Sequence, residues 1–164
     1  MNKKAIITVV LITAAAIGLM AWGYGRTSVP TEAQLNAPAA LAASETFYDF
    51  GAISMAKGKV DHAFRIANPT DRAITIRNLQ TSCMCTVAYL VDGDSKEGPF
   101  GMPGMGGMTA ADHVVPAGAT QSIDVVFDPA AHGTAGVGNI DRFIYATEAD
   151  GGTLQLEIKA VVTP

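Results

Sequence analysis

The sequence is poor in the residues that mark several common protein classes. It has only two cysteines in 164 residues, so it is not a small scaffold held together by many disulfides. Charged residues make up 16%, the formal net charge is -4 and no basic stripe is present, which excludes a typical nucleic-acid-binding protein. Gly-x-Ser-x-Gly and His-Glu-x-x-His motifs are also missing. We therefore expect that the chain is not an enzyme and does not bind nucleic acid.

A long apolar run begins close to the N-terminus. Lys3 and Lys4 precede an uncharged, mostly apolar run from Ala5 to Gly25. The apolar part of a signal peptide has about 7–15 residues, whereas a membrane-spanning helix needs about 20. We expect residues 1–26 to form an uncleaved transmembrane anchor, with a cleaved signal peptide as the alternative. In both cases the positive-inside rule places the rest of the chain in the periplasm, either anchored to the inner membrane or released.

The remaining chain divides into a tether and one domain. Residues 27–44 are rich in Ala, Pro and Ser and predict a linker between membrane and domain. Residues 45–164 are short enough for a single domain. Within it, residues 92–112 form a Gly/Met-rich insertion. Loops of this length are uncommon in compact domains and are often functional or disordered.

The domain shows the period-two pattern of half-buried β-strands. Apolar and polar residues alternate along several short segments that are separated by Gly, Pro, Asn and Asp turn signals. The predicted strands cover residues 47–53, 60–66, 74–77, 83–91, 122–127, 140–147 and 154–162. The residues expected in the core are Val60, Phe64, Ile66, Ile74, Ile76, Ile123, Val125, Phe127, Leu154, Leu156 and Ile158. About seven such strands predict an all-β, immunoglobulin-like antiparallel sandwich.

Both cysteines lie in one short motif, where a strand is predicted. Cys83 and Cys85 are separated only by Met84. On a strand their side chains would share one face, with Cα atoms about 6.5–7 Å apart. This is the outer limit for a disulfide, in which the Cα atoms lie about 4.4–6.8 Å apart. Three states stay open: a strained disulfide on a kinked backbone, two free thiols, or a site for a soft metal.

Several motifs follow one another in a fixed order along the domain. They are Phe47-Tyr48-Asp49-Phe50-Gly51, the segments 58–68 and 74–79, Thr81-Ser82-Cys83-Met84-Cys85-Thr86, Val115-Pro116-Ala117-Gly118 and Val125-Val126-Phe127-Asp128-Pro129. In this order they resemble the bacterial domain of unknown function 1573 family, from about Phe47 to Val162. The resemblance implies an exported immunoglobulin-like sandwich related to Hydin-type domains, and it implies no settled activity. The family has glycine between the cysteines. Met84 stands there in this chain and resists the positive φ that would favour a disulfide.

Three methionines in the insertion suggest a soft-metal site. Met102, Met105 and Met108 recur at every third residue among glycines, and sulfur ligands select Cu(I). The further candidate ligands are Cys83, Cys85, His113 and His62. The alternatives are a flexible insertion without function, a core histidine at position 62 and cysteines that are oxidised or buried.

Three functions are compatible with these features. The first is an exported, membrane-tethered immunoglobulin-like module that binds another protein of the cell envelope. The second is a Cu(I)-binding or copper-handling protein that uses the cysteines and the methionine loop. The third is a thiol redox protein that cycles the Cys-x-Cys pair. The expected partners are the membrane, through the N-terminal helix, and another envelope protein.

The predicted anchor is testable by fractionation. Because the apolar run is too long for an ordinary signal peptide, the protein should stay in the membrane fraction after carbonate extraction. The mature N-terminus should be Met1 or close to it. A soluble periplasmic protein that begins near Tyr24, Arg26 or Ala43 would contradict this prediction.

Overall fold

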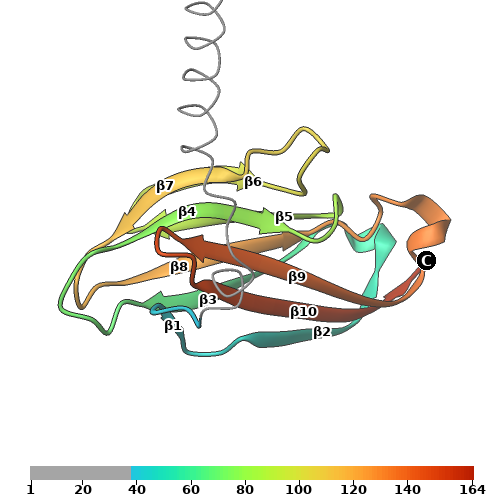
Figure 1. Ribbon diagram of the computed structural model, residues 1–164. Coiled ribbons are helices and arrows are strands. Elements are labelled where there is room, and N and C mark those ends of the chain that lie inside the picture. The colour runs from blue at the N-terminus through green and yellow to red at the C-terminus, as the bar shows by residue number, and fades with distance from the viewer. Residues whose placement is uncertain (1–37) are drawn as a thin grey trace, which may run out of the picture. The chain divides into compact units, whose positions relative to one another are not determined.

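The computed structural model describes residues 38–164, which form an all-β structure with almost no helix (Figure 1). Its strands are β1 (Ala42–Ala43), β2 (Phe47–Ser54), β3 (Val60–Ala67), β4 (Ile74–Thr81), β5 (Thr86–Asp92), β6 (Ser95–Phe100), β7 (Ala110–Val115), β8 (Thr120–Phe127), β9 (Gly138–Glu148) and β10 (Thr153–Thr163). Two short 3-10 helices are present, η1 (Met55–Lys57) and η2 (Gly133–Gly136). No helix within residues 38–164 combines the length and apolar character needed to cross a bilayer. The predicted anchor or signal segment, residues 1–26, lies outside the described residues.

The strands form two five-stranded sheets that pack as a sandwich (Figure 1). The strand order is β1-β3-β8-β5-β6 in one sheet and β2-β10-β9-β4-β7 in the other. The pair β2–β10 is parallel, whereas the other paired strands are antiparallel. The all-β sandwich predicted from the sequence is therefore confirmed. The expected number of about seven strands was too low, and the second sheet is mixed rather than purely antiparallel.

The additional strands have weak sequence patterns. β1 has only two residues, and β6 contains Gly98-Pro99 and lacks alternation. β6 and the start of β7 both lie in the insertion, residues 92–112, for which the sequence indicated a loop. The part of the insertion outside the strands is thus reduced to the turn at residues 93–94 and the loop at residues 101–109. The ends of this loop are close together: a Cβ atom on Gly107 would lie 2.9 Å from the Cα atom of Gly101, so this position requires glycine.

The core follows from the alternation along the strands. All the predicted core residues except Val60 are buried. Val60 is only partly buried because it is the first residue of β3, at the end of the sandwich. Phe64 and Phe127, from neighbouring strands of one sheet, have side chains at most 2% exposed. Apolar area removed from water in this way supplies the main stabilisation of the fold.

The sandwich begins before the predicted boundary at residue 45. β1 pairs with β3, and Leu41 belongs to the core with 3% of its surface exposed. The Glu148 carboxylate holds this segment, because it accepts hydrogen bonds from the Ala40 and Leu41 backbone amides at 3.0 and 2.7 Å. Glu148 is itself only 2% exposed, and a buried carboxylate needs such partners. Of the predicted tether, residues 27–37 lie outside the part of the chain that the structure describes.

Truncating a core phenylalanine tests the assignment of the strand faces. Phe64→Ala should lower the free energy of unfolding by about 3–5 kcal/mol, because it leaves a cavity between the sheets. Phe47 is 45% exposed, so Phe47→Ala is the matched control and should change the stability by less than about 1 kcal/mol. Urea denaturation of both variants measures the difference. Equal losses would mean that the strand faces are assigned wrongly.

The buried carboxylate gives a second test of the fold. Glu148→Gln keeps the shape of the side chain but removes its charge and places an amide NH2 group near two backbone donors. The free energy of unfolding should fall by about 1–3 kcal/mol. Glu157→Gln is the control, because Glu157 makes a surface ion pair with Lys159, and such pairs contribute only about 0–1 kcal/mol. If both variants are equally stable, Glu148 does not hold the start of the sandwich.

Candidate functional site

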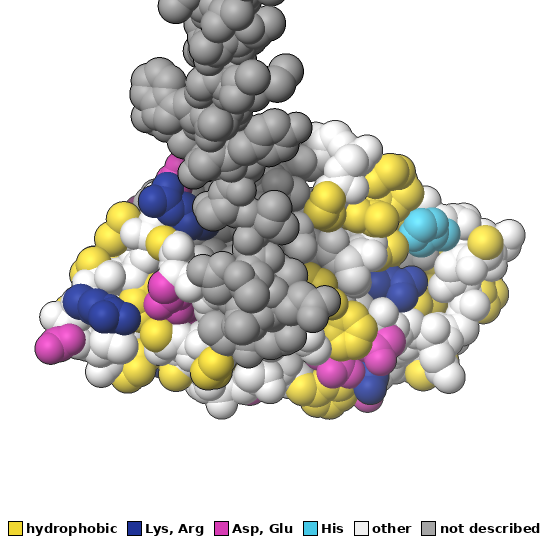
Figure 2. Space-filling view, in the orientation of Figure 1, with side chains coloured by type: hydrophobic (Ala, Val, Ile, Leu, Met, Phe, Trp, Pro, Cys, Tyr) yellow, Lys and Arg dark blue, Asp and Glu magenta, His cyan; other side chains and the backbone are white. Residues whose placement is uncertain are grey.

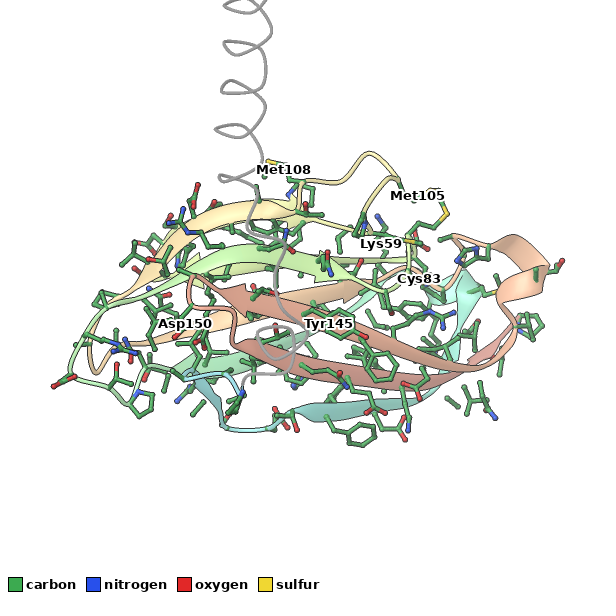
Figure 3. The ribbon with its side chains drawn as sticks, in the orientation of Figure 1. Lys59, Cys83, Met105, Met108, Tyr145 and Asp150 are labelled. Carbon is green, nitrogen blue, oxygen red and sulfur yellow. A yellow bond between two sulfur atoms is a disulfide. The ribbon has the colours of Figure 1, made fainter. Side chains whose placement is uncertain are left out.

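The two cysteines lie at one end of the sandwich, in the turn that joins β4 to β5 (Figure 3). Cys83 and Cys85 are joined by a disulfide, and their Cα atoms are 5.3 Å apart. The strand predicted from residue 83 therefore begins only at Thr86. Of the three states left open, the structure has the disulfide. The expected strand geometry, with Cα atoms at the outer limit for an unstrained bond, was wrong, because a turn brings the Cα atoms closer together than a strand does.

A turn of ordinary conformation forms this bridge. The Thr86 amide donates a hydrogen bond to the Cys83 carbonyl at 3.1 Å, which is the closing bond of a four-residue turn. Neither Met84 nor Cys85 has a positive φ. The methionine in place of glycine therefore does not prevent the bridge, because the turn needs no left-handed residue. The Met84 side chain projects outward and is 49% exposed.

Hydrogen bonds hold the turn to both sheets. On the side of β9, the Ser82 amide donates to the Phe143 carbonyl and the Phe143 amide donates to Ser82 Oγ, both at 2.9 Å. At the end of β8, the Asp128 amide donates to the Cys85 carbonyl at 2.8 Å. Thr81 Oγ1 adds a bond to the Cys83 carbonyl at 3.0 Å. These contacts fix the position of both sulfur atoms.

A histidine and an arginine flank the disulfide. His132 Nε2 lies 3.2 Å from Cys83 Sγ, and Arg142 Nε donates to Cys85 Sγ at 3.3 Å. Cys85 is 3% exposed and Cys83 is half-buried, while His132 is exposed. The ligand atoms of Cys83, Cys85 and His132 all lie within 4.8 Å of one another. The pair thus has an inner sulfur beside a guanidinium and an outer sulfur beside an imidazole.

His132 and Arg142 were not among the candidate residues predicted from the sequence. A signal for the arginine was present, since Ile140, Ile144 and Ala146 are buried on β9 and alternation places Arg142 on the same face. A charged residue among buried apolar residues is informative. No comparable signal marks His132, because only the tertiary structure brings the loop after β8 to the cysteine turn.

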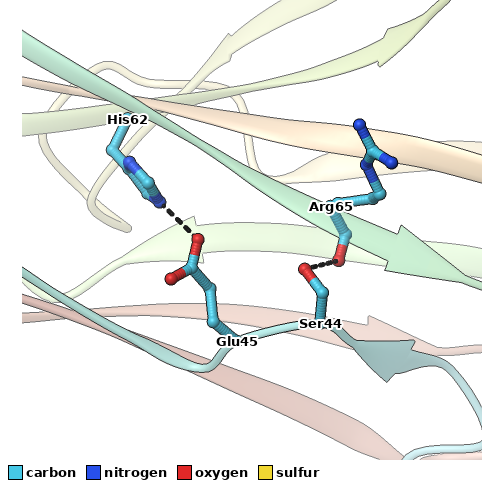
Figure 4. Close-up of polar contacts among 4 residues, drawn as sticks. All are labelled: Ser44, Glu45, His62 and Arg65. Atoms are coloured by element: carbon cyan, nitrogen blue, oxygen red, sulfur yellow. Dashed lines mark hydrogen bonds and ion pairs between the residues drawn. The ribbon is translucent and has the colours of Figure 1, made fainter.

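His62, one of the histidines considered as metal ligands, contacts other side chains of the fold. Its ring stacks on Tyr48, with 3.6 Å between the ring centroids and 9° between the planes. Its Nε2 atom is 2.9 Å from a Glu45 carboxylate oxygen (Figure 4). These contacts favour the alternative of a histidine that packs within the fold, with its Nε2 atom paired to Glu45.

His113 also has its hydrogen bonds satisfied within the sandwich. Its Nδ1 atom lies 3.0 Å from Glu97 Oε2, and its Nε2 atom lies 2.9 Å from Gln121 Oε1. These partners come from β6 and β8 of the facing sheet, so the ring links the two sheets. Both ring nitrogens are occupied, and metal binding there would require these hydrogen bonds to break.

The methionine loop begins beside the cysteine turn. The Thr81 amide donates to the Gly101 carbonyl at 3.2 Å, and the Gly101 amide donates to the Met108 carbonyl at 3.0 Å. Met102 is half-buried, whereas Met105 and Met108 are 55% and 50% exposed. In Figure 3, Met105 lies toward the same end of the sandwich as Cys83, and Met108 lies farther along it. The role of these methionines as metal ligands stays a prediction.

A separate open depression lies on the outer side of β9 and β10. It measures about 320 Å³ and is lined partly by Asp49, Asp141 and Lys159. A hydrogen bond to Glu157 raises the pKa of Lys159, and Asp141 contributes in the same direction. The ammonium group therefore stays charged among carboxylates and makes an ordinary surface ion-pair cluster.

The disulfide has little to contribute to the stability of the fold. It joins residues only two positions apart. The chain-entropy relation gives about 1.6 kcal/mol for closing a loop of three residues, compared with roughly 4.7 kcal/mol for a loop of 100 residues. The chemistry of the pair is therefore a better reason for its presence than its stabilising effect.

Reduction should leave the sandwich folded. Because the loop that the bridge closes is so short, breaking it should lower the free energy of unfolding by no more than about 2 kcal/mol. Urea denaturation with and without a phosphine reductant measures this change, and thiol alkylation confirms complete reduction. Unfolding of the reduced protein in the absence of urea would show that the bridge is structural.

Comparisons with known proteins support the fold more than any activity. A protein of unknown function from Porphyromonas gingivalis W83 is similar with a TM-score of 0.55 and 15% identity, over 83% of this chain and 51% of that one. This chain thus spans about half the length of that protein. At this identity the likeness concerns the fold alone. No curated protein sequence matches the chain.

Two other solved structures show weaker similarity. The ASH/PapD-like domain 7 of human CEP192 matches with a TM-score of 0.45 and 11% identity, over 76% of this chain and 85% of that one. The VesB protease of Vibrio cholerae matches with a TM-score of 0.44 and 19% identity, over 76% and 32% of the two chains. Neither likeness is close enough to carry an argument.

A family model matches the first half of the sandwich. The match covers residues 41–98, from the segment held by Glu148 to β6, and it includes both cysteines and the turn between them. It is shorter than the range of 47–162 over which the motifs resemble the family, but it agrees with the family that they predicted. The matching model is that of the family named Protein of unknown function (DUF1573), so residues 41–98 are similar to that family.

Proposed function

We propose that the chain is an exported, membrane-tethered, immunoglobulin-like module that exchanges electrons with a partner protein through the Cys83–Cys85 pair. The observation that carries the proposal is the disulfide with an imidazole at one sulfur and a guanidinium at the other. Disulfides persist in oxidising compartments outside the cytoplasm. The apolar N-terminal run supports the same location and a tether to the inner membrane.

The exposure of the two cysteines determines which sulfur atom a partner thiolate attacks. A partner thiolate attacks Cys83 Sγ, because Cys83 is half-buried and Cys85 is almost completely buried. The S–S bond breaks, a mixed disulfide forms with Cys83 and Cys85 leaves as a thiolate. A second thiolate of the partner then releases Cys83. The pair gains two electrons and two protons, and the partner dithiol becomes a disulfide.

The guanidinium of Arg142 favours this order of events. Its Nε–H group already points at Cys85 Sγ at 3.3 Å, where negative charge develops when the bond breaks. A positive group beside a sulfur stabilises the thiolate, and a more stable leaving thiolate makes exchange faster. Arg142 is a positioning and charge-stabilising residue for the leaving sulfur.

The imidazole of His132 serves the outer sulfur. Its Nε2 atom lies 3.2 Å from Cys83 Sγ, within reach of the proton on the thiol that reduction creates. His132 can therefore accept this proton when Cys83 is oxidised again. Because the ring is exposed, it can exchange the proton with water.

The surface around the pair suits a protein partner. Met84, which lies between the two cysteines, is a large apolar side chain with 49% of its surface exposed. On the face shown in Figure 2, Lys and Arg side chains stand near Asp and Glu side chains, with hydrophobic side chains between them. That face therefore carries no large area of charge of one sign. A module that binds a partner protein in this way needs no substrate pocket.

Thiol trapping in cells tests the partner. Cys85→Ser leaves the outer Cys83 free and should accumulate a mixed disulfide with an envelope protein, visible on a non-reducing gel. Cys83→Ser leaves only the buried sulfur and is the matched control, which should accumulate little. Equal trapping by the two variants, or none by either, would contradict the proposed exchange.

Reduction kinetics test the role of the arginine. A hydrogen bond to a charged group contributes about 1.5–3 kcal/mol, so Arg142→Gln should slow reduction of the full chain by dithiothreitol by about tenfold or more. Arg77→Gln is the control, since Arg77 pairs with Asp112 on the surface, and its rate should be unchanged. Alkylation followed by mass spectrometry gives both rates. An unchanged rate for Arg142→Gln would remove the arginine from the mechanism.

A further inference from the structure

We infer that the reduced cysteine turn binds one Cu(I) ion through Cys83 Sγ, Cys85 Sγ and His132 Nε2. This inference rests on the proposed function, because the pair has to be reduced before the sulfurs can bind a metal. The imidazole ligand is His132, in place of His62, whose Nε2 atom is paired with Glu45, and His113, both of whose ring nitrogens are hydrogen-bonded.

The three donor atoms are already gathered in the oxidised protein. They lie within 4.8 Å of one another. Donors that share one ion at bond lengths of about 2.0–2.3 Å lie on the order of 4 Å apart. When reduction breaks the S–S bond, the sulfurs separate toward this spacing and His132 needs only a small side-chain movement. The turn stays held by its hydrogen bonds to Phe143 and Asp128.

The charges around the site favour a monovalent ion. Two thiolates and one Cu(I) carry a net charge of minus one, which the Arg142 guanidinium beside Cys85 neutralises. With a divalent ion the same ligands would be neutral, and the guanidinium would be left without a compensating charge. The ligands are also soft, as Cu(I) prefers. A structural zinc site closes with four protein ligands, and the part of the chain that the structure describes brings three together here.

Metal binding and the disulfide exclude each other. A partner dithiol supplies two electrons and two protons, which break the S–S bond and leave two thiols. Cu(I) then displaces both thiol protons into solvent and forms two Cu–S bonds and one Cu–N bond. Oxidation of the pair with release of the ion reverses the process, so the redox state of the turn controls copper binding.

Competition with a chromophoric Cu(I) chelator tests the inference on the purified full chain in detergent. After reduction with a thiol-free phosphine, the protein should bind one equivalent of Cu(I), and the oxidised protein should bind none. His132→Ala should weaken binding at least tenfold, whereas His62→Gln, the control with another histidine changed, should bind like the wild type. Circular dichroism checks that both variants are folded.

Further variants test which residues bind the ion, and a comparison with Zn(II) tests which metal the site prefers. Replacing Met102, Met105 and Met108 by Leu should change the affinity by less than threefold, and a larger loss would overturn the three-donor site. An unchanged affinity in His132→Ala, or tighter binding of Zn(II) than of Cu(I), would also overturn it. Thiol alkylation measures, independently of Cu(I) binding, whether the disulfide has been reduced. A pair that cannot be reduced contradicts the proposed function, and a reducible pair that binds no Cu(I) contradicts only this inference.

Discussion

The chain crosses from one sheet of the sandwich to the other in the four residues 82–85, and the geometry of the candidate site depends on this crossing. β4 lies in one sheet and β5 in the other, and packed sheets are about 10 Å apart. So short a connection has to turn sharply, and hydrogen bonds to β9 and to the end of β8 hold it on both sides. The constraint brings the Cys83 and Cys85 sulfurs together and leaves one outside and one inside.

Two charged residues on the inner face of β9 make polar contacts at the two ends of the sandwich. Arg142 and Glu148 lie on the same face as the buried Ile144 and Ala146. Each has partners that satisfy it: Arg142 donates to Cys85 Sγ, and Glu148 accepts from the backbone of the segment that precedes β1. Burial of a charge is costly without such partners. One strand therefore supports the cysteine site at one end and the start of the domain at the other.

Stability and chemistry reside in different parts of the molecule. The buried side chains between the sheets supply the stability, and the histidines at positions 62 and 113 tie neighbouring elements together. The disulfide closes a loop too short to add much. Opening or closing the Cys83–Cys85 bridge should therefore change the stability of the fold only a little.

The sequence by itself determined the sandwich and its core, because the period of two along residues such as Phe64, Ile66 and Ile123 reports directly which face of a strand is buried. It also placed both cysteines in one motif and indicated the family. It could not give the two-residue strand β1 or the strands within the insertion, where alternation is absent. Only the tertiary structure decided that Cys83 and Cys85 form a bridge and that His132 and Arg142 flank it. These contacts join residues about 50 positions apart, and their geometry depends on how the loop after β8 and the strand β9 pack around the turn.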